Sequence, residues 1–204
     1  MTTLRAMDKA APYHHGNLRS ELLDLAERTV ERNGVAGLSL RGLARELGVS
    51  HNAPHQHFAD KQALLDALAV RGLRRLGDEL DKGLGRARGG FEERLTAFAR
   101  VYVGFATRYP ALLALVFAHK DDPARPELRE ANERAFAAPV ALIEGAAECG
   151  EIVADEPDRV AMAVLAVLQG LAAIITGGLI GDRSPDTVVT GTVHSLVQGL
   201  RPRG

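Results

Sequence analysis

The chain has 204 residues, of which 46% are hydrophobic and 25% are charged, and its formal net charge is −1. These values predict a globular protein of one or two domains with a sizeable core. Its single cysteine, Cys149, excludes an intrachain disulfide, and the first twenty residues contain no apolar run typical of a secretory signal, so we expect a cytoplasmic protein.

The charge is divided unevenly along the chain. Residues 1–75 contain 11 Lys or Arg and 8 Asp or Glu, a net charge of +3, whereas residues 76–204 carry a net charge of −4. A positive excess at one end suits contact with a polyanion, although three charges alone identify no partner.

The first predicted element is an amphipathic helix over about residues 17–33. Its apolar residues recur at steps of three and four, and Gly34 follows as a residue suited to the left-handed conformation that often ends a helix. The predicted buried face consists of Leu18, Leu22, Leu25, Ala26 and Val30. This pattern indicates a helix with one side in a core.

The next two predicted helices, over about residues 40–47 and 51–57, are short. Ser39 and Ser50 are residues suited to cap their N-termini. The turn between them consists only of Gly48 and Val49, so we expect the two helices to pack against each other.

The turn between these helices carries a packing pattern. Gly48 suits the turn conformation, Val49 is expected to enter the core, and Ala44 is small enough to face a crossing helix. Two short helices joined by a three- or four-residue turn that contains glycine are typical of a helix-turn-helix, whose second helix lies in the DNA major groove.

The stretch GVSHNAPHQHF, residues 48–58, contains a proline inside the predicted second helix of this unit. If Ser50 is the cap, Pro54 is the fourth helical residue, and its missing N–H removes at most the first intrahelical hydrogen bond. We therefore expect a tight first turn, of the 3₁₀ type, rather than a broken helix.

The histidines of this stretch raise the possibility of a metal site. His51 and His55 are four residues apart and would share one helical face, His57 lies elsewhere on the helix, and His14 and His15 precede the first helix. No cysteine is near, and no carboxylate stands between the pair as in HExxH. We expect no metal and no cofactor; solvated or packed histidines remain the alternative to contact with DNA.

The rest of the chain continues as predicted helices. Asp60 can cap a long helix over 61–84, a helix runs to about Arg108 before Pro110, and a short apolar helix follows. The charged stretch KDDPARPELRE is then expected to form a loop that leads into a helix ending near Gly150.

Two helices complete the predicted set. A long apolar helix is expected over about 156–180, beginning at Asp155 or Asp158, and a last one over about 186–200. Residues 160–181 contain no charge and are long enough to cross a bilayer. The segment is rich in Ala and Gly and has no aromatic or lysine anchors at its ends, which favours a helix buried within a protein over a membrane span.

The first third of the chain resembles the DNA-binding domain of the tetracycline-repressor (TetR) family. The similarity covers Tyr13 to Leu68, and the positions that follow the family pattern "GVS....YxHFxxK" are Gly48, Val49, Ser50, His57, Phe58 and Lys61. The departures are Pro54, where the family usually has Leu, and His55, where it usually has a Tyr that touches a phosphate. Phe58 and Leu43 are expected in the core.

The resemblance implies an all-α fold with two domains. Residues 1–70 would form a three-helix helix-turn-helix DNA-binding domain, and residues 71–204 an all-helical domain that binds a small effector and dimerises. The long helix after the head would link the two. Dimerisation would use the last two helices, 156–180 and 186–200, whose apolar surface exceeds what a monomer needs.

The resemblance also assigns residues to the DNA. The base edges would be contacted by His51, Asn52 and Gln56. The phosphates would be contacted by Ser39, Arg41, Ser50, His55 and Lys61. Asn and Gln can pair with adenine, and a lysine at a helix start offers charge and free N–H groups to a phosphate, so the chemistry agrees with this division.

An effector pocket is expected among the middle helices. The candidate lining residues, for each of which simple core packing is the alternative, are Tyr102, Phe105, Phe117, Phe136, Met162 and Gln169. The scarcity of charge in these segments indicates an apolar or neutral ligand.

The sequence thus predicts a homodimeric, ligand-responsive transcriptional repressor that binds a palindromic DNA operator. The alternatives are an all-α ligand-binding or scaffold protein that does not bind DNA, and a metalloprotein that uses the histidines. No nucleophile with a base, phosphate-binding glycine loop or catalytic carboxylate pair stands out, so no enzyme is expected.

Overall fold

The computed structural model describes residues 18–119, 124–153 and 156–202. Within these ranges the chain forms helices and no strand, which confirms the predicted all-α fold. Tyr13, His14, His15, Asp155 and part of the predicted charged loop lie outside them. The elements, in which η marks a 3₁₀ helix, are α1 (Leu18–Asn33), η1 (Val35–Gly37), α2 (Leu40–Glu46), η2 (Ala53–Gln56), α3 (Lys61–Arg86), α4 (Phe91–Arg108), α5 (Pro110–His119), α6 (Pro126–Glu148), α7 (Pro157–Thr176) and α8 (Pro185–Leu200).

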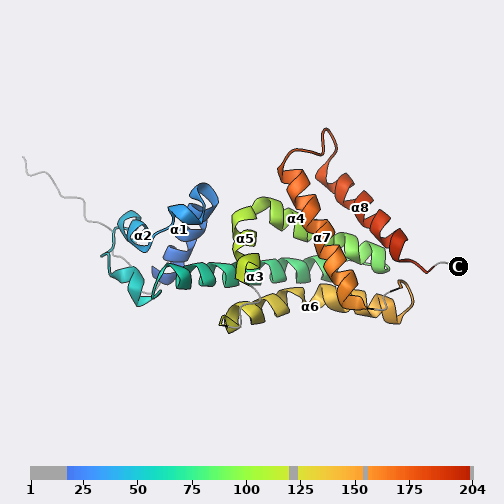
Figure 1. Ribbon diagram of the computed structural model, residues 1–204, viewed down its shortest axis with the longest axis horizontal. Helices are drawn as coiled ribbons and strands as arrows, with labels where there is room; N and C mark the ends of the chain where they lie inside the picture. Colours follow the sequence, from blue (N-terminus) through green and yellow to red (C-terminus); the bar gives the residue numbers. More distant parts are fainter. Residues whose placement is uncertain (1–17, 120–123, 154–155, 203–204) are drawn as a thin grey trace, which may run out of the picture.

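Residues 18–60 and the first turns of α3 form a small unit at one end of the molecule, called the head below (Figure 1). All five residues of the predicted inner face of α1 are buried, as the periodicity of this helix predicts. The helix ends at Gly34, whose φ of 67° lies in the left-handed region that favours glycine. The first predicted helix is therefore confirmed in extent and in orientation.

Helix α3 joins the head to the rest of the molecule. It begins where the sequence predicts, because the side chain of Asp60 accepts a hydrogen bond from the N–H of Ala63 at 2.8 Å. It then runs without a break to Arg86, so the boundary predicted at residue 70 falls inside a continuous helix (Figure 1). Leucines along its length are buried, in the head near its start and among the C-terminal helices further along.

The C-terminal helices surround the second half of α3. Helices α4 and α5 pack on one side of it and α6 packs on the other, while α7 crosses α4 and α6 and α8 lies outermost against α4 (Figure 1). The chain bends by 102° between α4 and α5, at the Tyr109–Pro110 break that the sequence predicts. This bend turns α5 back toward the head, where it contacts α1.

The start of α7 differs from the expectation. The helix does not begin at Asp158, and Asp155, the other predicted start, lies outside the described residues. Glu156 is the cap, without a side-chain capping bond, and Pro157 is the first helical residue. Proline is favoured at this position because its fixed φ suits the helix and its missing N–H would have no intrahelical partner. The helix ends at Thr176, before the glycine pair that follows it.

Two glycines let the neighbouring helices approach α3 closely. A Cβ added to Gly72 would lie 2.8 Å from Cγ of Leu112 in α5, and one added to Gly77 would lie 3.3 Å from Cα of Ala135 in α6. Real side chains do not pack at the first distance, so the position of α5 depends on the missing side chain at Gly72.

Ion pairs hold α1 against α3. Arg71 contacts Asp24 at 2.5 Å, and Arg75 donates to the Glu27 carboxylate at 2.6 Å. The hydrogen bond to Glu27 raises the pKa of the Arg75 guanidinium, despite the opposing effect of its burial. The same guanidinium lies 5.0 Å from the ring centroid of Tyr109, at the bend between α4 and α5. The head is thus fixed to the corner where α4, α5 and α3 meet.

We predict that Gly72→Ala lowers the free energy of unfolding by about 1–2 kcal/mol, because the strain against the buried Leu112 exceeds the gain in helix propensity. Gly104→Ala in α4 is the matched control: nothing lies within 4 Å of its added Cβ, so it should raise stability by up to about 1 kcal/mol. Urea denaturation of both variants measures the difference. Equal stabilisation by the two changes would contradict the close approach at Gly72.

Candidate nucleic-acid interface

The first helix and the turn of the predicted helix-turn-helix form as expected. Ser39 caps α2 by accepting the N–H of Gly42 at 3.1 Å. Gly48 has a φ of 69°, and the N–H of Val49 donates to the carbonyl of Ala44 at 3.0 Å. Ala44 is buried against the neighbouring elements, as its small size predicts.

The second helix of the unit is shorter than predicted. Residues 51 and 52 form a turn, and only Ala53–Gln56 is helical, as a 3₁₀ helix. The prediction of an α-helix over 51–57 with Ser50 as its cap is therefore wrong. The residue that precedes the 3₁₀ helix is Asn52, and its side chain makes no capping bond. Pro54 explains the difference, because it lacks an N–H and disfavours the α conformation at the residue before it.

The side chains of this segment divide into two faces. Pro54 and Phe58 point into the head and are buried, Phe58 with the guanidinium of Arg19 at 5.3 Å from its ring centroid. The polar side chains are exposed, namely those of His51, Asn52, His55, Gln56 and His57. Phe58 and Leu43 are core residues, as expected. The segment therefore presents a continuous polar surface although it lacks a full α-helix.

All three residues predicted to contact bases are on this surface. His51, Asn52 and Gln56 are exposed, and the described part of the chain makes no hydrogen bond or ion pair with their side chains. Their donors and acceptors are therefore free to meet the edges of bases.

His55 is oriented by a hydrogen bond to the backbone. Its Nδ1 lies 3.2 Å from the carbonyl oxygen of Ala59, which can only accept, so Nδ1 carries a proton. The neutral ring then offers Nε2 as an acceptor, and Nε2 donates only when the ring is protonated. His55 can therefore bind a phosphate as an imidazolium, whereas the tyrosine usual at this position donates from a neutral hydroxyl.

The remaining predicted phosphate contacts fall into two groups. Ser39, Arg41 and Ser50 are exposed, and Arg41 makes no ion pair within the described residues. Lys61 is half-buried, and its ammonium donates to the carbonyl of Val35 at 2.7 Å. Lys61 thus ties the start of α3 to η1, and only its other two N–H groups are left for a phosphate.

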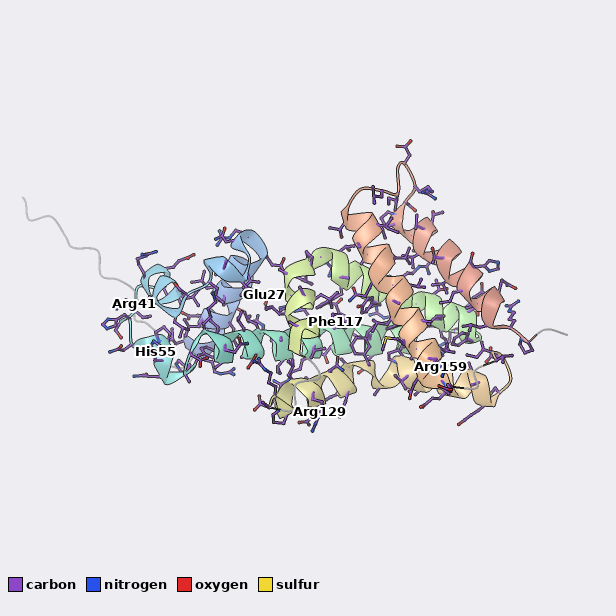
Figure 2. The ribbon with its side chains drawn as sticks, viewed as in Figure 1. Glu27, Arg41, His55, Phe117, Arg129 and Arg159 are labelled. Carbon is purple, nitrogen blue, oxygen red and sulfur yellow. The ribbon has the colours of Figure 1, made fainter. Side chains whose placement is uncertain are left out.

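Arg41 and His55 mark the outer end of the head, farthest from the C-terminal helices (Figure 2). Arg71 and Arg75 are paired with Asp24 and Glu27 near the opposite end of the head, and because each pair is neutral, the net charge of +3 over residues 1–75 lies on the remaining residues. Arg41 and Arg45 of α2 are both exposed.

The histidines of residues 51–57 do not form a metal-binding cluster with other described residues. Among the residues that the structure describes, no group of three or more His, Cys, Asp or Glu side chains is close enough to hold an ion.

The candidate effector residues of the C-terminal part are divided by the structure. Phe117, Phe136 and Met162 line a cavity of about 310 Å³ bounded by α4, α5, α6 and α7. Tyr102 and Phe105 are fully buried in the core, and Gln169 does not line the cavity.

Tyr102 is buried close to this cavity without lining it. Burial raises the pKa of its phenol, and its hydroxyl has no hydrogen-bond partner among the described residues. Its ring centroid lies 6.3 Å from that of Phe136, which does line the cavity.

Several further residues of the cavity wall were not predicted, among them Phe98, Asn132, Pro139 and Asp158. On α6 the signal was present in the sequence, because Asn132, Phe136, Pro139 and Ile143 follow one another at steps of three and four and therefore share a helical face. Asp158 carried no such signal, since a single acidic residue at a helix start is usual.

Two family models match the chain. The model for the N-terminal domain, described as "Bacterial regulatory proteins, tetR family", matches residues 22–68, and the model "Tetracyclin repressor-like, C-terminal domain" matches residues 95–196. The second match alone covers half of the chain.

Individual proteins agree with the two domain matches. A Rhodococcus protein of unknown function is 40% identical, with a TM-score of 0.85 over 95% of this chain and 100% of that chain. The TetR family transcriptional regulator PfmR from Thermus thermophilus shares the fold, with 19% identity and a TM-score of 0.68 over 89% of this chain and 99% of that one.

An HTH-type transcriptional regulator of Mycobacterium tuberculosis is 30% identical over 101 residues, which are 49% of this chain and 43% of the relative. The tetracycline repressor protein class D of Escherichia coli is 40% identical over 60 residues, 29% of this chain and 28% of the repressor. The chain spans half or less of the length of these curated relatives. Because one family model matches half of the chain and a second matches residues 22–68, the chain belongs to the TetR family of bacterial regulatory proteins.

Proposed function

We propose that the protein is a DNA-binding transcriptional regulator that binds a palindromic operator as a homodimer and responds to a small molecule. The observation that carries this proposal is the division of faces in residues 51–58: the apolar side chains pack into the head, and exposed polar side chains face outward, with His55 oriented by its bond to Ala59. A DNA-reading segment needs such a rigid base under an exposed hydrogen-bonding surface.

Within this proposal, the exposed residues have separate roles. His51, Asn52 and Gln56 read base edges in the major groove, and the phosphates are bound by Ser39, Arg41, Ser50, His55 and Lys61. The short 3₁₀ helix favours contact through a few residues near its start, since only its first turn can reach the bases. The proposed DNA binding and the family both support a cytoplasmic location, and no catalytic role is proposed.

The partner in the proposed dimer is a second copy of the chain. Helix α7 is long and apolar enough to cross a membrane by length and composition, and only 28% of its most apolar stretch is buried in the single chain. Met162 is 63% exposed and Ile174 is 42% exposed, with small residues between them. Pairing of α7 and α8 with the same helices of a second copy would cover this surface without a membrane.

A dimer also fits the proposed reading of DNA. Two recognition segments held about 34–36 Å apart would contact two half-sites one helical turn apart, and a ligand that changes this separation would change the affinity. Release of DNA by an effector bound among α4 to α7 would make the protein a repressor.

The proposal is tested by footprinting the purified protein on the DNA beside its own gene and by measuring affinity for the protected site against salt. We expect Arg41→Ala to reduce the slope of log affinity against log salt by about 1.8, since each protomer of the dimer loses one phosphate contact. Arg159→Ala is the control, because Arg159 lies at the start of α7, far from the head (Figure 2). Protection that is absent, or an unchanged slope for Arg41→Ala, would contradict the assignment.

Lys61→Met separates the structural role of this residue from its contact with DNA. The change keeps the aliphatic stem but leaves the carbonyl of Val35 without its donor, so we expect a free energy of unfolding lower by about 1 kcal/mol. Lys82→Met on the exposed side of the same helix should change stability by less than about 0.5 kcal/mol. Denaturation curves that coincide for the two variants would mean that the Val35 bond contributes nothing.

Ala166→Arg tests the proposed dimer. Ala166 is exposed near the middle of α7, so a charged side chain there should separate the protomers without disturbing the fold. We expect a monomer in analytical ultracentrifugation and an affinity for the operator lower by at least about a hundredfold, because the two heads no longer act together. Ala137→Arg, at an exposed position of α6, should remain dimeric. A dimer that survives Ala166→Arg would place the interface elsewhere.

A further inference from the structure

The cavity among α4, α5, α6 and α7 has the size and the walls of a small-molecule site. Its volume is about 310 Å³, at the lower end of the range usual for ligand pockets. Most of the side chains that line it are apolar. An apolar cavity of this size favours a ligand with a compact hydrophobic body.

Three phenylalanine rings from three different helices line this cavity. Phe98 comes from α4 and is buried, while Phe117 from α5 and Phe136 from α6 are half-buried. Aromatic rings bind flat hydrophobic groups by stacking, and their faces attract cations. The three rings therefore suit an aromatic ligand and are compatible with a positive charge near them.

Among the described residues, the charge of the cavity wall has one sign. Asp158, in the first turn of α7, is the one ionisable side chain of this set that lines the cavity, and no described Lys, Arg or His does. Within the described residues Asp158 makes no ion pair or hydrogen bond, whereas the next residue, Arg159, is paired with Glu156 at 2.7 Å. A ligand carboxylate or phosphate would meet no cation here, and an ammonium group would meet a free carboxylate.

A second polar group of the wall lacks a partner. The side-chain oxygen Oδ1 of Asn132 is buried and accepts no hydrogen bond from the described residues. Asn132 lies on the same face of α6 as Pro139, which has no N–H to give to the carbonyl of Ala135 one turn earlier. A buried acceptor without a donor is costly, so Asn132 favours a ligand that supplies an N–H or O–H.

From these observations we infer that the effector is a lipophilic amine that binds in its protonated form. Its aromatic or apolar body lies among the three phenylalanine rings, its ammonium group pairs with Asp158 at the mouth of the cavity, and a further N–H or O–H donates to Asn132. The inference rests on the proposed ligand response for its biological meaning, but the binding itself does not require DNA.

Three indole compounds of nearly equal size test the sign of the charge: tryptamine, which is a cation, tryptophol, which is neutral, and indole-3-acetate, which is an anion. All three carry an indole N–H for Asn132. We expect calorimetry on the DNA-free protein to give an affinity for tryptamine at least about tenfold higher than for indole-3-acetate, with tryptophol between them.

Two carboxylates at the start of α7 provide a matched pair of variants. Asp158→Asn should lower the affinity for tryptamine by about fivefold and leave that for tryptophol unchanged, because only the cation pairs with the carboxylate. Glu156→Gln removes one negative charge two residues before Asp158, from a side chain that does not line the cavity. It should leave the affinities for tryptamine and tryptophol unchanged. Asn132→Leu, which keeps the size of the side chain, should lower the affinity for all three compounds by about fivefold.

The inference is overturned if indole-3-acetate binds as tightly as tryptamine, if Asp158→Asn and Glu156→Gln act alike on tryptamine, or if none of the three compounds binds at millimolar concentration. The operator affinity of Asp158→Asn is measured in parallel and should equal that of the unchanged protein. DNA binding without amine binding would refute the ligand class alone, and amine binding without DNA binding would refute the proposed regulator alone.

Discussion

The continuous packing of α3 is the constraint on which the rest of the structure depends. One helix of 26 residues supplies buried leucines to the head at its start and to the C-terminal helices further along. No break or proline interrupts it, so the orientation of the head follows from what packs against its second half. The missing side chains at Gly72 and Gly77 bring α5 and α6 within direct contact of its backbone. A rigid axis of this kind transmits a displacement, whereas a flexible linker would absorb it.

Helix α5 connects the cavity and the head through short contacts. Phe117, near its end, lines the cavity, and the N–H of Leu112, near its start, donates to Glu31 of α1 at 3.3 Å. Tyr109, just before it, lies against the guanidinium of Arg75, which is in turn paired with Glu27. The wall of the cavity and the support of the head therefore share one helix of 10 residues. A ligand that displaces Phe117 acts on an element that already contacts α1.

Helix α7 illustrates why a long apolar segment is ambiguous. Its length and composition alone would allow it to span a membrane, and the buried fraction of the helix within one chain is too small for a core helix. Its inner side nevertheless packs on α4, α6 and α8, and Val164 and Leu168 are buried there. The exposed side combines small residues with a few large apolar ones, a surface that suits close packing with another helix. Family membership and the proposed dimer account for this surface together.

The sequence by itself determined those features that depend on residues close together in the chain. The caps at Ser39 and Asp60, the turn at Gly48 and the apolar face of α1 all rest on contacts within a few residues, and all were predicted. The same holds for the outward position of Asn52 and Gln56, because the buried Phe58 fixes which face is left for them.

Tertiary structure decided the features that depend on how helices rotate and cross. It bound the ammonium of Lys61 to Val35, and it separated Phe117 and Phe136, which line the cavity, from Tyr102, which fills the core. It also brought Asp158 to the mouth of that cavity from a helix far along the chain. Aromatic residues at helical spacing look alike in a sequence whether they face a cavity or a neighbouring side chain, because a rotation of the helix by a fraction of a turn exchanges the two.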